Sequence, residues 1–147
     1  MSLNNKIQLC YINIKELWQW IEENNLLAQD FTNEKKKWSG TINQEPNFFS
    51  DTELMLIYQD IILLKALTDS QANFLAKTYQ LEYQNLCQKI FQDNKNIILV
   101  SERQWTMDNN SSKKSKEQKK EEKAIVLFKD RESIEKSLVN WLQEPNT

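Results

Sequence analysis

The pattern of apolar and polar positions predicts a mainly helical chain. The opening "KIQLCYI" fits either a short strand or a lead-in turn. Asn13 and Glu16 then stand three residues apart, the spacing of a capping box, and apolar residues recur on one side of a helix over about 14–28. Trp20 lies off that side, so it packs either under a neighbouring loop or on a partner surface.

Residues 30–51 are irregular and contain the only Gly of the chain. We interpret them as a loop held to the body by Trp38, Phe48 and Phe49. Because exposed aromatic clusters are typical of interfaces, a peptide-docking patch is the alternative.

The clearest helix signal covers about 51–66, where Ser50 and Glu53 again have the capping-box spacing. This stretch is apolar on most sides, with Leu56 and Leu63 among its members. A helix that is apolar all round is enclosed in a core or between subunits, and in a chain of 147 residues this favours a partner.

Thr68 and Gln71 predict the start of another helix over about 69–92. Its apolar residues follow a three–four spacing that fits either the protein's own core or a seam for a partner helix, and Phe74 and Leu81 lie off this seam. Since the connection near residue 67 is short, we expect the two helices to form an antiparallel hairpin.

The C-terminal third contains two apolar runs. "NIILV" (96–100) reads as a buried strand, although periodicity alone leaves 97–105 open between strand and helix. "AIVLF" (124–128) also reads as a strand, and an amphipathic helix is predicted over about 131–143. The polar, charged residues 108–123 separate them and predict a disordered linker.

Together these elements predict a mainly α fold, a helical hairpin or bundle with a small two-stranded β element and a C-terminal amphipathic helix. The expected organisation is a helical body over 1–107, a flexible basic linker over 108–123, and a strand plus helix over 124–147 that packs back on the body.

Charge and composition narrow the functional classes. The net charge is −2, but six Lys and three Glu make 111–123 a basic island. The two widely spaced Cys favour reduced, intracellular thiols. No apolar run approaches 18 residues, so we expect neither a signal peptide nor a membrane span.

Catalytic motifs are missing from the sequence. Without His there is no Ser-His-Asp or Cys-His machinery and no His-containing zinc site, and a single Gly excludes phosphate-binding glycine loops. We expect no enzyme activity, catalytic residue, metal, cofactor or small-molecule substrate. A small enzyme using Lys or carboxylates alone is the remaining alternative, to which no residue is assigned.

One stretch resembles a homeodomain. Leu67, Thr68, Gln71, Leu75 and Tyr79 match the first helix of that family, and "SERQW" (101–105) is similar to the entry to its recognition helix. The Trp-Phe-x-Asn-Arg core of the family is absent, since "WTMDNNSSKK" stands in its place. The resemblance implies duplex DNA contacts by the following residues: Arg103, Asn109, Asn110, Lys113, Lys114, Lys116, Lys119 and Lys120.

In size, composition and lack of catalytic motifs the chain is also similar to small homeobox-like accessory proteins of ciliate MT-A70-type DNA adenine-N6 methyltransferase complexes. It lacks the Asp-Pro-Pro-Trp motif of the methylating subunit. The resemblance implies a nuclear accessory subunit whose partners are the protein subunits of a larger complex.

Our leading hypothesis is therefore a non-catalytic accessory or scaffold subunit, in the nucleus rather than the cytoplasm. A stand-alone protein–protein interaction module without DNA binding is the alternative. The residues predicted to face a partner are large and apolar: Trp20, Trp38, Phe48, Phe49, Leu56, Leu63, Phe74 and Leu81.

Overall fold

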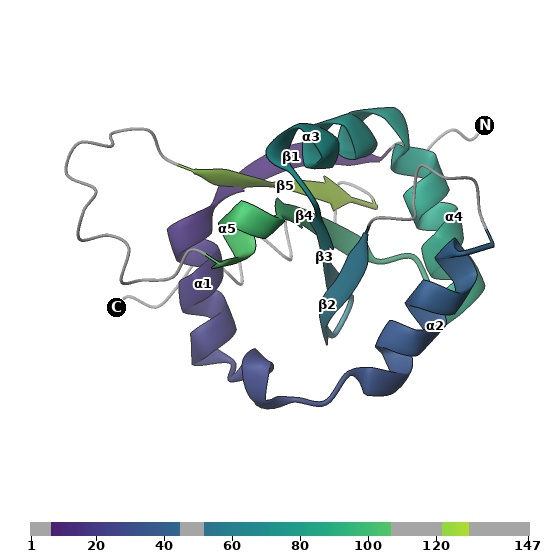
Figure 1. The fold of residues 1–147 in the computed structure, drawn as a ribbon, viewed down its shortest axis with the longest axis horizontal. Helices are drawn as coiled ribbons and strands as arrows, with labels where there is room; N and C mark the ends of the chain where they lie inside the picture. Colours follow the sequence, from purple (N-terminus) through teal and green to yellow (C-terminus); the bar gives the residue numbers. More distant parts are fainter. Residues whose placement is uncertain (1–6, 45–51, 107–121, 130–147) are drawn as a thin grey trace.

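The protein is an α/β protein built on a five-stranded mixed sheet, as a computed structural model shows (Figure 1). The structure describes residues 7–44, 52–106 and 122–129. The strands, in sheet order, are β1 (Gln8–Asn13), β5 (Lys123–Phe128), β4 (Asn96–Ser101), β3 (Ile61–Ala66) and β2 (Glu53–Tyr58). Only β3 and β4 are parallel to each other. The predicted mainly α fold with a two-stranded element is therefore wrong.

The main error concerns residues 51–66, which form the hairpin β2–β3 instead of a helix. The strands are joined by Gln59 and Asp60, and Gln59 adopts a left-handed backbone with φ 57°. In β3, Ile62 and Leu64 face one core while Ile61 and Leu63 face the other. A strand covered on both sides is apolar at successive positions, which explains why the run resembled an enclosed helix.

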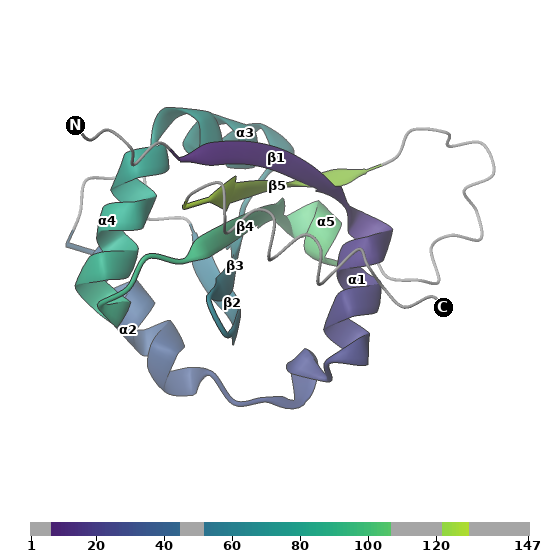
Figure 2. The same cartoon turned by 180° about the vertical axis from the view of Figure 1, so that it is seen from behind.

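Helices cover both sides of the sheet (Figures 1 and 2). One core packs α1 (Ile14–Glu23) and the short η1 (Leu26–Ala28) against alternate residues of the strands. The other core packs α2 (Thr32–Ile42), α3 (Asp69–Thr78) and α4 (Gln80–Phe91) against the remaining ones. Because each strand presents alternate side chains to the two cores, the central strand β4 is buried at every position.

Two predicted helix starts are confirmed. The side chain of Asn13 accepts hydrogen bonds from the N–H groups of Lys15 (2.8 Å) and Glu16 (3.3 Å) at the start of α1. Thr68 Oγ1 accepts one from the N–H of Gln71 (3.0 Å) at the start of α3. The predicted helix over 69–92 is divided at Tyr79 into α3 and α4, and its seam packs on the sheet of the same chain.

The two apolar runs of the C-terminal third are strands, as predicted, and they pair antiparallel as β4 and β5. The short α5 (Glu102–Thr106) follows β4 directly. The irregular stretch after residue 30 includes a helix, α2, over most of its first half. The predicted linker falls mostly within 107–121, and the predicted helix over 131–143 lies entirely outside the described residues.

Candidate functional site

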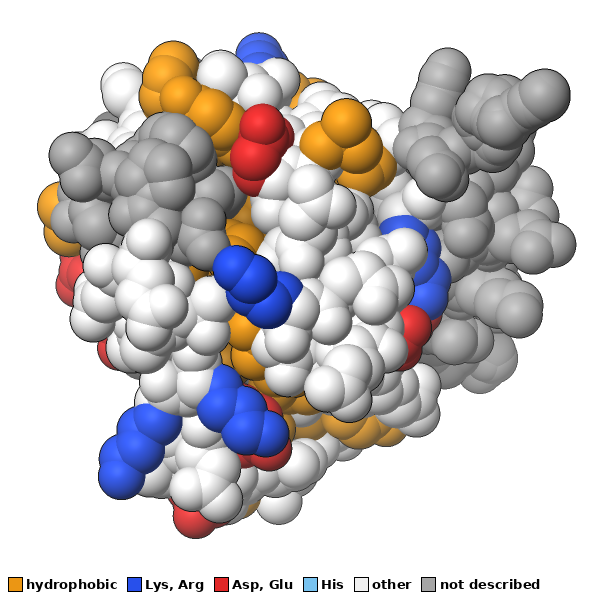
Figure 3. All heavy atoms as spheres, turned by 90° about the vertical axis from the view of Figure 1, so that its right-hand side faces the viewer, with side chains coloured by type: hydrophobic (Ala, Val, Ile, Leu, Met, Phe, Trp, Pro, Cys, Tyr) orange, Lys and Arg blue, Asp and Glu red, His pale blue; other side chains and the backbone are white. Residues whose placement is uncertain are grey.

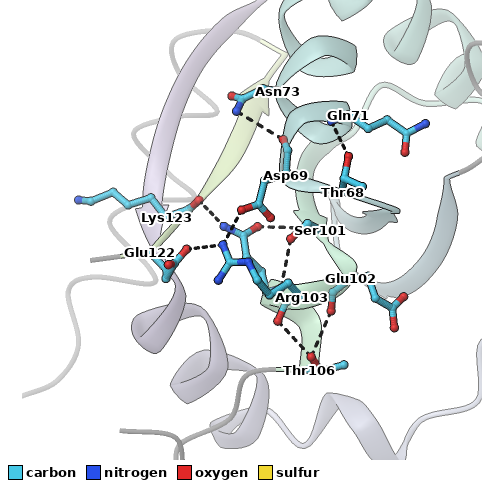
Figure 4. A network of polar contacts seen from close by, with 11 residues as sticks. Thr68, Asp69, Gln71, Asn73, Ser101, Glu102, Arg103, Thr106, Glu122 and Lys123 are labelled. Carbon is cyan, nitrogen blue, oxygen red and sulfur yellow. Dashed lines mark hydrogen bonds and ion pairs between the residues drawn. The ribbon is translucent and has the colours of Figure 1, made fainter. Parts of the chain in front are cut away.

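A polar network lies at the carboxyl ends of the parallel strands β3 and β4 (Figure 4). Ligands of α/β proteins commonly bind at this edge of a sheet, because the loops that follow parallel strands meet there. Here α3 begins just after β3 and α5 begins directly after β4. Their first turns bring Asp69 and Arg103 together, although these residues are 34 positions apart in the sequence.

Arg103 is the centre of this network. Its guanidinium forms ion pairs with Asp69, on α3, and with Glu122 at 2.8 Å, just before β5. The backbone carbonyl of Glu122 also accepts a hydrogen bond from the N–H of Ile14 at 3.0 Å. Arg103 therefore connects α3, α5 and the start of β5 near the point where α1 begins.

The neighbouring Gln104 fixes the same junction from the buried side. Its N–H donates to Ser101 Oγ (3.1 Å), and its Oε1 accepts from the N–H of Ser101 (3.0 Å). Its Nε2 donates to the carbonyl of Lys123 at 3.0 Å. This reciprocal arrangement satisfies backbone groups at the start of α5, which is what a capping interaction does.

A second cation, Lys65 of β3, contacts two carboxylates. Its Nζ lies 2.8 Å from Glu102 Oε1 and 3.5 Å from Glu53 Oε1, and Glu53 is the residue opposite it in the hairpin. The Lys65 side chain is 16% exposed, so its aliphatic stem is packed while its ammonium group lies against these two carboxylates.

The protonation states follow from these contacts. The hydrogen bond from Arg103, with a further one from Ser101, holds the pKa of Asp69 below its ordinary value. The hydrogen bond to Glu102 raises the pKa of Lys65. At neutral pH the carboxylate is therefore ionised and the amine protonated. A catalytic base or acid has the opposite property, a pKa moved toward the working pH, so this network fits a structural role.

The two cysteines are also held in their protonated form. Burial raises the pKa of the Cys10 thiol to about 11 and that of Cys87 to about 12. A nucleophilic cysteine needs a lowered pKa and an accessible sulfur. Among the described residues, no group of His, Cys, Asp and Glu is arranged to hold a metal ion.

The structure describes only one of the residues that were predicted to bind DNA. Arg103 is the single one described, and both of its ion-pair partners are acidic residues of the same chain. The other residues predicted for DNA lie outside the described residues: Asn109, Asn110, Lys113, Lys114, Lys116, Lys119 and Lys120. The stretch "SERQW" itself contains the end of β4 and most of α5.

The residues predicted to face a partner fall into two groups. Four of the described ones belong to the core and are at most 8% exposed: Trp20, Trp38, Leu56 and Leu63. Phe74 and Leu81 are exposed at 54% and 57%, while Phe48 and Phe49 lie outside the described residues. The buried group serves this chain's own packing, so among the described residues of this set only Phe74 and Leu81 present a surface.

Phe74 and Leu81 lie on either side of the junction between α3 and α4. The rings of Phe74 and Tyr79, the residue at this junction, pack edge to face with 5.8 Å between their centroids. Leu81 follows two residues later. We call Phe74, Tyr79 and Leu81 the α3–α4 elbow. No signal in the sequence marks Tyr79 for this role, because the predicted helix over 69–92 runs through it.

The two helices that carry the elbow are packed against the core on their other side. In α3 the residues on the opposite side, including Leu75 and Ala76, are buried against the sheet, and in α4 Tyr83 and Leu86 are buried as well. The exposed side chains therefore stand on helices that are fixed by the core. Figure 3 shows the face of the molecule that carries α2 and α4, where exposed apolar side chains form separate small groups between charged ones.

The fold and the site define the protein as an α/β protein with a self-paired polar network and an exposed apolar elbow. A scan against models of protein families found no match, and searches of curated proteins and of solved structures found no similar protein. In the described part of the chain, no helix is long and apolar enough to span a membrane.

Proposed function

We propose that this chain is a non-catalytic accessory subunit that binds a protein partner of a larger complex through the α3–α4 elbow. The observation that carries the proposal is the exposure of Phe74 and Leu81 on either side of Tyr79. Other large apolar side chains of the same two helices, such as Leu75 and Leu86, are buried. Covering the exposed pair would gain about 25 cal/mol for each Å² removed from water.

Aromatic residues on a rigid support are typical of the positions that contribute most to a protein interface. Phe74 is held by Tyr79 and by the packing of α3 on the sheet, so little conformational entropy is lost when a partner covers it. The elbow comprises few residues. We therefore expect a small, reversible interface instead of an obligate one.

The state of the polar network supports a non-catalytic role. Arg103 and Lys65 each contact two carboxylates of the same chain, and these contacts lower the pKa of Asp69 and raise that of Lys65. A ligand that bound to this network would have to displace carboxylates that already pair with both cations, which lowers the affinity that it could gain. The network is better suited to holding α3, α5 and β5 together.

DNA binding stays a separate prediction. A phosphate would have to compete with Asp69 and Glu122 for Arg103, which lowers the affinity that this residue could provide. The nuclear location and the methyltransferase complex likewise rest on the homeodomain-like resemblance. The subunits of that complex are therefore the first partners to test.

The test is a quantitative affinity purification of the full chain from its own organism. The tagged wild type is compared with Phe74→Ser/Leu81→Ser and with Leu27→Ser, which removes an equally exposed leucine, 57%, from η1. Proteins that bind the elbow should be lost from the double variant and kept by Leu27→Ser. An identical set of co-purifying proteins for all three would refute the proposal.

Binding to duplex DNA is measured in parallel at several salt concentrations. Affinity that falls when Lys113, Lys114 and Lys116 are changed to Gln, and that is unaffected by the elbow variant, would add a DNA contact to the accessory role. Methyltransferase subunits among the elbow-dependent proteins would support the complex implied by the resemblance.

A further inference from the structure

The outer strand β1 lacks the features that usually protect the edge of a sheet. Its sequence, QLCYIN, contains no charged residue and no Pro, and it pairs with β5 from Gln8 to Asn13 without a shift in register. The other outer strand, β2, has a bulge between Leu54 and Leu56 and packs against α2. Bulges and charges are among the features that prevent association of edges, and β1 has neither within its own span.

The direction of the free hydrogen-bonding groups of β1 follows from one contact. The N–H of Ile14 donates to the carbonyl of Glu122 at 3.0 Å, in continuation of the β1–β5 ladder. Since direction alternates along an antiparallel strand, Cys10 and Ile12 also point their backbone groups toward β5. Leu9 and Tyr11 point theirs outward. In the part of the chain that the structure describes, no strand pairs with this outer side.

We propose that a second copy of this chain pairs its β1 antiparallel with this edge, about a twofold axis that passes by Cys10. Leu9 then lies opposite Tyr11 of the second copy, and Tyr11 opposite its Leu9. Each of these pairs exchanges the outward N–H and C=O groups. The two sheets become one continuous sheet, and the interface is the same surface on both subunits.

The residues of β1 favour a second copy and this register. A strand without charge meets no like-charge repulsion when it pairs with itself. Tyr11 is 47% exposed and Leu9 half-buried, so an aromatic–aliphatic pair across the interface removes apolar surface from water. A register centred on Tyr11 would instead place Leu9 opposite Asn13, whose side chain is engaged in capping α1.

The first test is the mass of the full chain in solution, measured by sedimentation equilibrium from about 1 to about 100 µM. We expect a dimer whose dissociation constant rises at least about tenfold in Tyr11→Lys, because a lysine on the edge opposes pairing. Leu27→Lys is the control, since it adds the same charge at a comparably exposed site away from β1, and it should leave the dimer unchanged.

A second test uses Cys10 and does not depend on how Tyr11→Lys folds. In the proposed register the two Cys10 Cα atoms are about 4.5 Å apart, within the range of a disulfide. Copper phenanthroline, which takes up the two electrons as the thiols lose their protons, should give a covalent dimer of Cys87→Ser and none of Cys10→Ser. A monomer at every concentration overturns the proposal. So does a dimer that Tyr11→Lys leaves unchanged and that forms no Cys10 disulfide.

Discussion

Replacing Trp38 with Ala should remove the main contact that holds α2 on the sheet. Trp38 and Ile42 are the buried residues of this helix, and Trp38 is fully buried. Its ring lies nearly parallel to that of Tyr83, with 7° between planes and 6.5 Å between centroids. Its indole N–H donates to Thr52 Oγ1 at 3.3 Å.

The magnitude follows from the buried surface. A buried Trp removes about 150–250 Å² from water, which at about 25 cal/mol per Å² corresponds to about 4–6 kcal/mol. Because the unfolded chain already hides part of this surface and the site relaxes after truncation, we expect a loss of about 3–5 kcal/mol. Trp38→Phe retains a ring and loses the N–H group, so its loss should be smaller, about 1–2 kcal/mol.

The assay is urea unfolding followed by far-ultraviolet circular dichroism. The matched control is Lys37→Ala, the exposed neighbour on the same helix, for which we expect a change within about 0.5 kcal/mol. If Trp38→Ala destabilises the protein no more than Lys37→Ala does, the placement of α2 on the sheet and the burial argument are both refuted.

Three further predictions concern single groups. Thr68→Ala should lower the free energy of unfolding by about 1 kcal/mol in the same assay, because the N-cap of α3 is lost. Since Arg103 lowers the pKa of Asp69, this carboxylate stabilises the fold above its unfolded pKa of about 3.9 and loses that effect as the pH falls through its folded pKa. Urea unfolding across acid pH should therefore depend less on pH in Arg103→Gln, and an unchanged dependence would contradict the ion pair. Cys87, whose pKa burial raises to about 12, should not react with a thiol reagent at pH 8 until urea unfolds the chain, and rapid native labelling in Cys10→Ser would show that it is accessible.

Local signals in the sequence predicted local structure correctly. The caps at Asn13 and Thr68 depend on side chains two or three residues from the groups they bind, and both form. The runs 97–100 and 124–128 are rich in β-branched and aliphatic residues and are strands. The sequence therefore contained enough information for caps, whose contacts lie within a few residues, and for short apolar runs whose residue types favour a strand.

The hairpin 53–66 could not be identified in this way. Both faces of its second strand, β3, are buried, so the strand period is hidden there, and an apolar run of this kind reads equally well as a helix. The turn offers no help, because Gln59 occupies the left-handed position where Gly or Asn is the usual signal. Without that signal, only the strand pairings distinguish strand from helix, and one of them joins β3 to β4, some 35 residues later.

In the candidate site, too, local features could be predicted from the sequence and long-range contacts could not. Phe74 and Leu81 were predicted to lie off the main apolar seam, and they are exposed. Arg103 was identified through the homeodomain-like resemblance, but its contacts are with Asp69 and Glu122, which are 34 and 19 residues away. The sheet brings these three together, and no spacing within the sequence indicates it.

The α3–α4 elbow and the edge of β1 have no residue in common, so binding at one can be measured while the other is disrupted. If the chain both pairs through β1 and binds a partner through the elbow, the two contacts reinforce each other. A twofold pair of chains presents two identical elbows, and a partner with two copies of the cognate surface would bind the second one at a high effective concentration. Linked sites of this kind gain about 10²–10⁴ in avidity without any new contact, provided that the geometry allows both to engage. A small apolar surface such as the elbow, too weak by itself for a lasting complex, would then be sufficient for one.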